Sequence, residues 1–274
     1  MSERADKIPD PKLLWPLAER LADAARVAVL PFFRAAALQV DNKLAGGFDP
    51  VTEADRAAED AIRALLGAER PQDAILGEER GGTAGRSGLT WIIDPIDGTR
   101  SFLSGMPTWG VLIGLADASG AILGVIDQPY IGERFCGGLG RAEMQGPLGR
   151  KALSVGRARP LKDAILFTTF PEVGTPAEGA AFARVAAQAR LVRYGADCYA
   201  YALVAAGQVD LVIEAGLQAY DVAALIPVIE AAGGLVTDWQ GAPILQGGQM
   251  RWSGQVIAAA NREIHAEASA LLRG

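Results

Sequence analysis

The segment that most constrains this chain is Trp91–Thr99, WIIDPIDGT, where an apolar run leads directly into two aspartates. Residues 90–93 predict a short buried strand, because large apolar and β-branched side chains follow one another without a polar break. Such a strand would deliver Asp94 and Asp97 to its end. Unpaired carboxylates are costly to bury, so this placement requires either bound cations or raised carboxyl pKa values.

A second pair of carboxylates follows another apolar run. Residues 74–76 predict a strand, and Glu78 and Glu79 come after it, separated from it by one glycine. Hard divalent cations such as Mg²⁺ prefer oxygen ligands. Carboxylates that converge at strand ends therefore indicate a metal site.

The residues between and after the two aspartates could add further ligands. A turn at Asp94–Asp97 would offer the Ile96 carbonyl to a metal, and Pro95 would limit the conformations of that turn. Gly98 and Thr99 stand at a possible helix start, where N–H groups and a hydroxyl could hold phosphate oxygens. The alternative is that both aspartates only form turns, as Asp-Pro and Asp-Gly pairs often do, and that the Glu-Glu pair is solvated surface.

Composition excludes several classes of protein. The net charge of −6 and the pI near 5.0 argue against a general affinity for nucleic acid. The charged N-terminal residues do not resemble a signal peptide, and no apolar run reaches membrane-spanning length, so we expect a cytoplasmic protein without membrane contact. Cys136 and Cys198 lack zinc or redox spacing and should be buried free thiols. His265, the single histidine, is expected to be structural or exposed, which leaves no residue for a histidine-based phosphatase mechanism.

The periodicity predicts a layered α/β protein of one compact unit. Helical spacing runs from 11 to about 36, and a loop follows at 44–50. A second helix begins at a Thr52/Asp55 cap and continues to Leu66, so that Asp55 lies in its first turn. A surface loop is expected at 80–88. Further strands are predicted at 109–116, 121–127, 131–137, 164–168, 209–213 and 255–259, and further helices at 177–190, 198–206, 221–232 and 261–272.

The run Trp91–Thr99 resembles the signature of the inositol-monophosphatase family, which related fructose bisphosphatases and bisphosphate nucleotidases share. Three more matches occur in the family's order, and together they extend the resemblance over about residues 13–270. They are Val51–Asp55, Gly77–Glu79, and Tyr220–Ala224 followed by Glu230–Gly234. Many members have tryptophan where this chain has Tyr220, which is still aromatic.

The resemblance implies alternating layers of helices and mixed sheets in a single unit, 1–274. Its approximate halves are 1–150, with the metal core and a mobile loop, and 151–274, with the substrate wall and the last metal ligand. Lys43 would lie on the mobile loop near the active site, unless it is an ordinary surface lysine. Members commonly form homodimers, so we expect a homodimer.

The resemblance also implies the roles of individual residues. Two or three Mg²⁺ ions per active site would be held by Glu78, Asp94, the Ile96 carbonyl, Asp97 and Asp221, with Asp94 bridging two of them. Asp55 would hydrogen-bond to Thr99 and help to deprotonate a water that the metal activates, and this water would attack phosphorus in line. The substrate is then a phosphate monoester of a small molecule.

Two carboxylates in the C-terminal half bear on the choice of substrate. Glu214 matches a family position that contacts the substrate outside its phosphate, and Asp197 stands where polyol phosphatases of the family have a small uncharged residue. A carboxylate there would favour a cationic leaving group. With its wider sequence context, the chain therefore resembles the histidinol-phosphatase branch, which acts in histidine biosynthesis. Arg193 could shape the same wall, and the alternative role for Asp197 is a helix N-cap.

Three other functions stay open. The nearest is an inositol or broad polyol monophosphatase, and the next is a 3′(2′),5′-bisphosphate nucleotidase. Both would use the same metal core. A function of a different class is that of a catalytically silent binder of phosphate ligands, against which the complete set of carboxylates argues.

Overall fold

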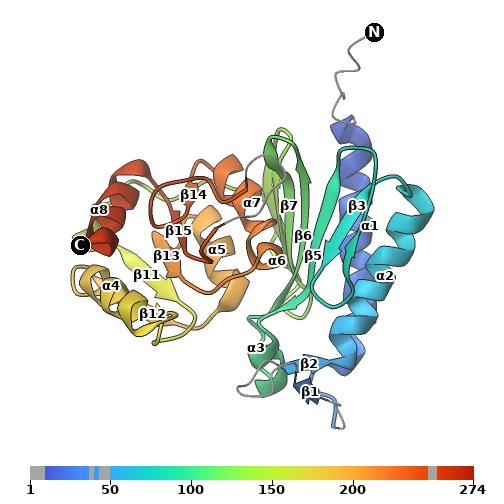
Figure 1. Cartoon of the computed structure of the whole chain (residues 1–274), viewed down its shortest axis with the longest axis horizontal. Helices are drawn as coiled ribbons and strands as arrows, with labels where there is room; N and C mark the ends of the chain where they lie inside the picture. Colours follow the sequence, from blue (N-terminus) through green and yellow to red (C-terminus); the bar gives the residue numbers. More distant parts are fainter. Residues whose placement is uncertain (1–9, 37–39, 43–49, 246–251) are drawn as a thin grey trace.

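Helices and sheets alternate in five layers through the molecule (Figure 1). The computed structural model describes residues 10–36, 40–42, 50–245 and 252–274. The helices are α1 (Pro11–Val29), α2 (Glu53–Glu69), α3 (Thr99–Ser104), α4 (Pro176–Ala186), α5 (Asp197–Ala205), α6 (Ala219–Val222), α7 (Leu225–Ala231) and α8 (Arg262–Arg273). α1 and α2 cover one face of a larger sheet, α5, α6 and α7 lie between the two sheets, and α4 and α8 cover the far face of the smaller sheet. This order of layers confirms the predicted fold class.

The larger sheet brings the predicted metal-site segments to the same end of two neighbouring strands. Within the described residues the larger sheet has eight strands and the smaller has five. The larger contains, in spatial order, β10 (Gly149–Ala152), β9 (Arg141–Gly146), β8 (Glu133–Gly138), β7 (Gly120–Gln128), β6 (Gly110–Asp117), β5 (Thr90–Asp97), β3 (Ala74–Gly77) and β4 (Gly81–Thr83); the smaller contains β12 (Leu191–Tyr194), β11 (Ile165–Thr168), β13 (Leu211–Glu214), β15 (Val256–Ala259) and β14 (Leu235–Thr237). β1 (Val40–Asn42) and β2 (Pro50–Thr52) form a separate antiparallel pair. Because β3 and β5 are parallel, the residues that follow them emerge at the same edge of the larger sheet.

Three large apolar cores lie between the layers in the described part of the chain. Leu21, Ile62 and Trp91 belong to the core between α1, α2 and the larger sheet. Tyr201 and Val228 belong to the core between the sheets. A third core lies between the smaller sheet, α4 and α8. The helices are therefore held to both sheets by burial of apolar area, the main favourable term in folding.

Several predicted boundaries are wrong for identifiable reasons. The first helix does not reach residue 36: α1 ends at Val29, and a 3-10 turn follows over Leu30–Phe32. Pro31 has no N–H to continue the helical ladder. The predicted helix 221–232 is divided into α6 and α7, because Pro227 cannot donate the hydrogen bond that would join them.

Other predictions missed whole strands. The predicted loop 80–88 contains the edge strand β4, and the periodicity also failed to reveal β1, β2, β9, β10, β12 and β14. These are short strands of three to six residues, some of them exposed, so their side chains carry little alternation. The loop predicted at 44–50 lies mostly outside the described residues.

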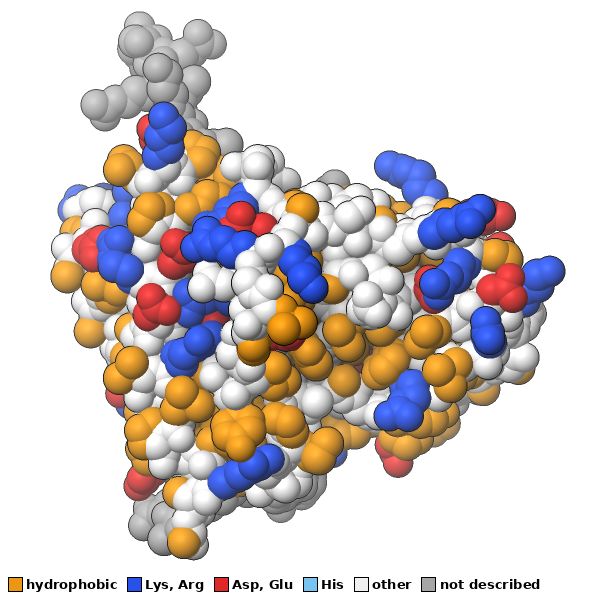
Figure 2. Space-filling view, turned by 180° about the vertical axis from the view of Figure 1, so that it is seen from behind, with side chains coloured by type: hydrophobic (Ala, Val, Ile, Leu, Met, Phe, Trp, Pro, Cys, Tyr) orange, Lys and Arg blue, Asp and Glu red, His pale blue; other side chains and the backbone are white. Residues whose placement is uncertain are grey.

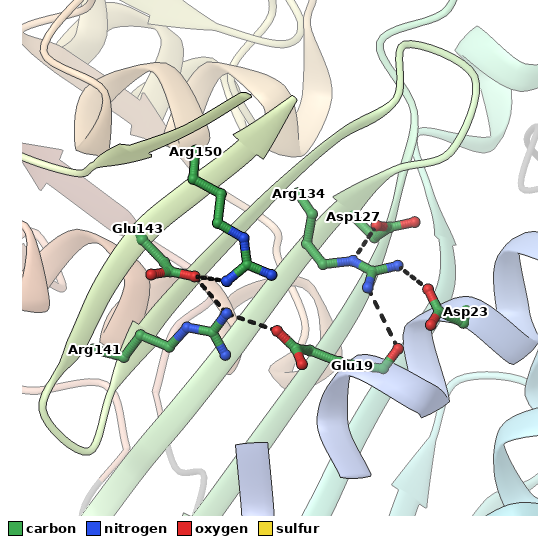
Figure 3. Close-up of polar contacts among 7 residues, drawn as sticks. All are labelled: Glu19, Asp23, Asp127, Arg134, Arg141, Glu143 and Arg150. Carbon is green, nitrogen blue, oxygen red and sulfur yellow. Dashed lines mark hydrogen bonds and ion pairs between the residues drawn. The ribbon is translucent and has the colours of Figure 1, made fainter. Parts of the chain in front are cut away.

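A network of charged side chains joins α1 to the larger sheet (Figure 3). Asp127 on β7 is fully buried, and its Oδ1 accepts hydrogen bonds from Arg134 Nε at 2.6 Å and Arg26 Nη2 at 2.7 Å. Arg134 also donates to Asp23 on α1 at 2.7 Å. Arg141 extends the network by donating to Glu19 and Glu143. The buried carboxylate is thereby compensated by two cations, as a charge away from water requires.

Two smaller predictions concern the cysteines and the membrane. Cys136 and Cys198 are buried free thiols, as predicted. In the part of the chain that the structure describes, no helix is long and apolar enough to cross a membrane. The cytoplasmic location, the homodimer and the division into halves near residue 150 stay predictions.

The single histidine gives a testable link between pH and stability. His265 on α8 is buried, and its Nε2 lies 2.6 Å from the hydroxyl of Thr237, which donates its own proton to the Asp238 carbonyl. Burial, with help from the charges of Arg262 and Arg273, lowers the pKa of His265 below its usual value. The unfolded chain therefore binds more protons than the folded chain below about pH 6.5, and folding stability is lost as the pH falls through this range.

Replacing His265 by glutamine should weaken this pH dependence, because glutamine cannot titrate. Urea unfolding at pH 7 and pH 5 should show a smaller loss of unfolding free energy for the variant than for the native chain. The unfolding free energies of the two proteins should differ in their change with pH by at most about 1.4 kcal/mol per pH unit, the effect of one proton. An equal change of unfolding free energy with pH in the two proteins would contradict the prediction, since all other titrating groups are common to both.

Candidate active site

β5 carries the first two carboxylates of the site. Its apolar residues are buried, and the strand continues through Pro95 to Asp97 instead of ending in the turn predicted from the sequence. The register with β6 shifts between Asp94 and Asp97, which pair with Leu112 and Gly110. Residues three apart in a regular strand point to opposite faces, but one extra residue in a bulge brings them to the same side. The irregularity therefore lets both aspartates reach one site.

Two further carboxylates come from other elements. Carboxylate oxygens of Asp94, Asp97 and Asp221 all lie within 4.8 Å of one another. Asp221 is on α6, where its Oδ2 accepts a hydrogen bond from the Gln218 N–H at 2.5 Å. Glu78 directly follows β3, and its N–H donates to the Ile93 carbonyl on β5 at 3.2 Å. The structure thus brings together the oxygens of Asp94, Asp97 and Asp221, and the Glu78 side chain lies beside Asp94.

Burial, together with the mutual repulsion of negative charges, raises the pKa values of the three aspartates in this cluster. Burial is the main cause for Asp94, and the negative charges of Glu78, Asp97 and Asp221 add to it. Burial likewise raises the pKa of Asp97, and that of Asp221 to about 7. A bound cation relieves this repulsion, and carboxylate and carbonyl oxygens are the ligands that hard divalent ions prefer. The chemistry of the donor set therefore fits a divalent metal.

Asp55 lies beside this cluster in the first turn of α2. Its Oδ2 accepts from the Thr52 N–H at 2.8 Å and from the Thr52 hydroxyl at 2.6 Å, so the predicted cap is confirmed. Burial, followed by the charges of Glu79 and Glu78, raises the pKa of Asp55 to about 7. A carboxyl with a pKa near neutrality can both accept and release a proton.

The expected hydrogen bond between Asp55 and Thr99 is not what the structure shows. The hydroxyl of Thr99 instead donates to the Ile96 carbonyl at 3.2 Å. A threonine hydroxyl has one proton, and here a carbonyl three residues earlier in the chain is its acceptor.

Gly98 forms a tight turn between β5 and α3. Its φ of 84° lies in the left-handed region, and a Cβ at this position would lie 2.7 Å from the Asp197 Cγ. Glycine is therefore required both by the backbone conformation and by the approach of α5.

Asp197 is held by α3 and the loop after it. Its Oδ2 accepts from the Ser101 hydroxyl at 2.6 Å and from the Thr108 hydroxyl at 3.1 Å. The alternative prediction that Asp197 is the helix N-cap is wrong, because Ala196 occupies that position and Asp197 is the first residue of α5. Sequence periodicity could not reveal this, since the carboxylate is recruited by hydroxyls from another element rather than by its own helix.

The N-terminus of α5 also contacts the metal ligands. The Cys198 N–H donates to the Asp97 Oδ2 at 2.6 Å. An N–H in the first turn of a helix stabilises negative charge.

A cavity of about 280 Å³ opens beside the carboxylate cluster. It is lined by residues of 97–100, 168–174, 197–201 and 214–217, together with Asp221 and Leu225. Glu214 is buried in its wall, where its two oxygens accept from the Thr169 N–H and the Tyr201 hydroxyl, each at 2.8 Å. The cavity therefore joins the N-terminal carboxylates to the predicted substrate wall.

Two other residues were predicted to lie near the site, Arg193 and Lys43. Arg193 is exposed on β12 and is not among the residues that line this cavity, so its part in the substrate wall stays a prediction. Its strand runs along the edge of the smaller sheet. Lys43 lies outside the described residues.

Comparison with known proteins shows which family this chain belongs to. The profile of the inositol monophosphatase family matches residues 14–273 of the chain. The chain belongs to the inositol monophosphatase family. The resemblance noted in the sequence is thereby confirmed, and the chain is a phosphatase of this metal-dependent family.

Relatives in this family carry different names. A bifunctional phosphatase, IMPL2, of Arabidopsis thaliana is 41% identical, and the match covers 90% of this chain and 71% of the relative. A histidinol-phosphatase of Chlorobaculum parvum is 38% identical, with 82% of this chain and 85% of the relative covered. Among solved structures, an inositol monophosphatase from Zymomonas mobilis is 36% identical, has a TM-score of 0.84, and is matched over 97% of this chain and 100% of its own.

Three aromatic or charged residues of the cavity wall were not predicted from the sequence: Arg100, Phe170 and Tyr201. Phe170 is partly exposed, and the Arg100 guanidinium carbon lies 4.7 Å from the centre of its ring. Tyr201 donates to Glu214 as described above. Tyr201 lies four residues after Asp197 on a predicted helix, a spacing that places two side chains on one face and could have indicated it. Nothing in the local sequence pairs Arg100 with Phe170.

Proposed function

We propose that this phosphatase hydrolyses histidinol phosphate to histidinol and phosphate, a step of histidine biosynthesis, with Mg²⁺ as its metal. The observation that carries the proposal is the buried carboxylate of Asp197 in the cavity wall. Both of its hydrogen bonds use Oδ2, so Oδ1 can accept from a cation in the cavity. Histidinol carries an ammonium group, which an acidic wall would bind by a charge-assisted hydrogen bond.

Glu214 strengthens the acidic character of this wall. Burial raises the pKa values of Glu214 and Asp197, which means that each carboxylate is costly to leave uncompensated. A cationic leaving group would compensate them, whereas a neutral polyol would not. The name of the Chlorobaculum parvum relative agrees with this choice.

The residues of the site have separate tasks in the proposed reaction. When bound to the four carboxylates, Mg²⁺ would supply Lewis acidity and lower the pKa of a water. Asp55 would take the proton of the attacking water, since its carboxylate lies in the first turn of α2 beside the cluster. Gly98 and Thr99 would contact phosphate oxygens. Asp197 and Glu214 would hold the leaving group in line with the attack.

A second candidate is hydrolysis of inositol phosphate or another polyol phosphate. It is supported by the similarity to the Zymomonas mobilis structure, which is described as an inositol monophosphatase. Steady-state kinetics on histidinol phosphate, inositol 1-phosphate and adenosine 3′,5′-bisphosphate decide between these functions. We expect kcat/KM to be highest for histidinol phosphate; a higher value for either competitor would overturn the proposal.

Replacing Asp197 by asparagine should reduce kcat/KM for histidinol phosphate by about 10- to 100-fold, from the loss of a charged hydrogen bond worth about 1.5–3 kcal/mol. Asparagine can still accept the hydrogen bonds from Ser101 and Thr108 through its carbonyl oxygen. Turnover of 4-nitrophenyl phosphate, which has no cation, should change much less. Equal losses on both substrates would contradict cation recognition by Asp197.

A further inference from the structure

Glu59 is a fully buried carboxylate outside the predicted metal site. It lies on α2 four residues after Asp55, and this spacing places both side chains on the same face of the helix. Its Oε2 accepts from the Glu79 N–H at 2.7 Å, and its Oε1 accepts from the Arg80 N–H at 3.1 Å and from Arg63 Nε at 2.7 Å. Both oxygens are therefore occupied, mainly by the backbone of the turn that follows β3.

The same turn is held by other contacts with α2. Arg63 donates to the Thr83 hydroxyl at 3.0 Å and also to the Gly81 carbonyl. A Cβ on Gly77 would lie 2.1 Å from the Glu59 Oε1, so only glycine admits the carboxylate at this distance. Glu59 and Arg63 thus fix the whole segment from β3 to β4 against the helix.

Glu78 lies at the centre of this segment. Its own N–H donates to Ile93 on β5, and the next N–H, that of Glu79, donates to Glu59. The backbone of Glu78 is consequently tied on one side to the strand that carries Asp94 and on the other side to the helix that carries Asp55.

We propose that Glu59 is a positioning residue that sets the place of Glu78 relative to Asp94 and thereby determines the metal affinity of the site. The inference rests on the proposed role of Glu78 as a metal ligand. Groups that orient metal ligands typically contribute about 10- to 100-fold to metal affinity. Glu59 would act in this way through two backbone N–H groups.

The first test is Glu59→Gln in the full-length protein. The amide keeps the size of the side chain, but its NH₂ group must face at least one N–H donor, so one hydrogen bond to the turn is lost. The matched control is Asp60→Asn. Asp60 lies on the same helix and forms an exposed ion pair with Arg80 of the same turn, but it does not bind the backbone around Glu78.

The measurement is a magnesium titration without substrate, by isothermal calorimetry and by the metal-induced rise in melting temperature. The second readout is the magnesium concentration that gives half-maximal hydrolysis of 4-nitrophenyl phosphate. We expect Glu59→Gln to require about 10- to 100-fold more magnesium in both, while kcat at saturating magnesium stays within about threefold of the native value. Asp60→Asn should match the native protein within about twofold, because an exposed ion pair contributes little.

A lower melting temperature in EDTA with an unchanged magnesium requirement would show that Glu59 is only structural and would overturn the inference. If Glu59→Gln does not fold, Glu59→Asp gives the second test, since the shorter carboxylate keeps its charge but cannot reach both N–H groups. It should shift the magnesium requirement in the same direction, and no shift would overturn the inference. Absence of magnesium binding by the native protein would instead overturn the magnesium assignment, and the inference with it, whichever phosphate ester is the substrate.

Discussion

Replacing Asp94 by asparagine is expected to lower kcat/KM for phosphate ester hydrolysis by about 1,000-fold or more, because the metal supplies several kcal/mol of transition-state stabilisation and each 1.36 kcal/mol is worth about tenfold. Asp94 is the buried member of the set whose oxygens lie within 4.8 Å of one another. Asparagine has nearly the same shape but no charge to offer a divalent cation. The loss should be measured with 4-nitrophenyl phosphate over a range of magnesium concentrations.

The same substitution should not weaken the fold in the absence of metal. Asp94 is surrounded by Glu78, Asp97 and Asp221, and their mutual repulsion opposes folding when no cation is bound. We therefore expect the melting temperature of Asp94→Asn in EDTA to be equal to or higher than that of the native protein. Asp117→Asn, at the β6–β7 turn, is the matched control and should leave activity unchanged. Full activity of Asp94→Asn with magnesium would contradict the metal site.

The largest effect on stability is expected from Trp91→Ala. Trp91 is fully buried in the core between α1, α2 and the larger sheet, and its indole N–H donates to Asp73 at 3.0 Å. Truncation of a buried tryptophan removes its apolar contacts and leaves a cavity, so the free energy of unfolding should fall by about 3–5 kcal/mol. Urea unfolding in EDTA measures this loss without a contribution from the metal.

Trp91→Phe separates the two parts of that effect. Phenylalanine fills much of the cavity but donates no hydrogen bond, and Asp73 keeps its contacts with Arg70. The expected loss is about 1.5–3 kcal/mol, the contribution typical of a hydrogen bond to a charged group. If the alanine variant loses no more stability than the phenylalanine variant, packing by Trp91 contributes little and the prediction is wrong.

The site combines a stabilising part with a destabilising part along one strand. The first half of β5 contributes buried apolar side chains to the core, and its second half presents carboxylates that repel their neighbours. Burial of the apolar half offsets the cost of concentrating negative charge where a cation is to bind. For this reason Trp91→Ala is expected to lower the stability of the metal-free protein, whereas Asp94→Asn is not.

The C-terminal half of the site shows the limits of local prediction. A carboxylate at Asp197 can be noticed in the sequence, but its acceptance of hydrogen bonds from Ser101 and Thr108 depends on how α5 packs against α3. Arg193 was also suggested for this wall. The structure places it on β12, an exposed edge strand of the smaller sheet, outside the lining of the cavity.

The sequence by itself determined the features that depend on neighbouring residues: the buried strand that leads into Asp94, the Thr52 and Asp55 cap, and most longer helices and strands. Local spacing sets these, because periodicity and capping act within a few residues. The tertiary structure alone decided that the strand does not end before Asp94 but continues through a bulge to Asp97. It also brought Asp221, which the family resemblance had named, next to Asp94 and Asp97, and it placed Glu59 against the turn of Glu78. These contacts join separate layers of the fold, and only packing of the layers brings such distant segments together.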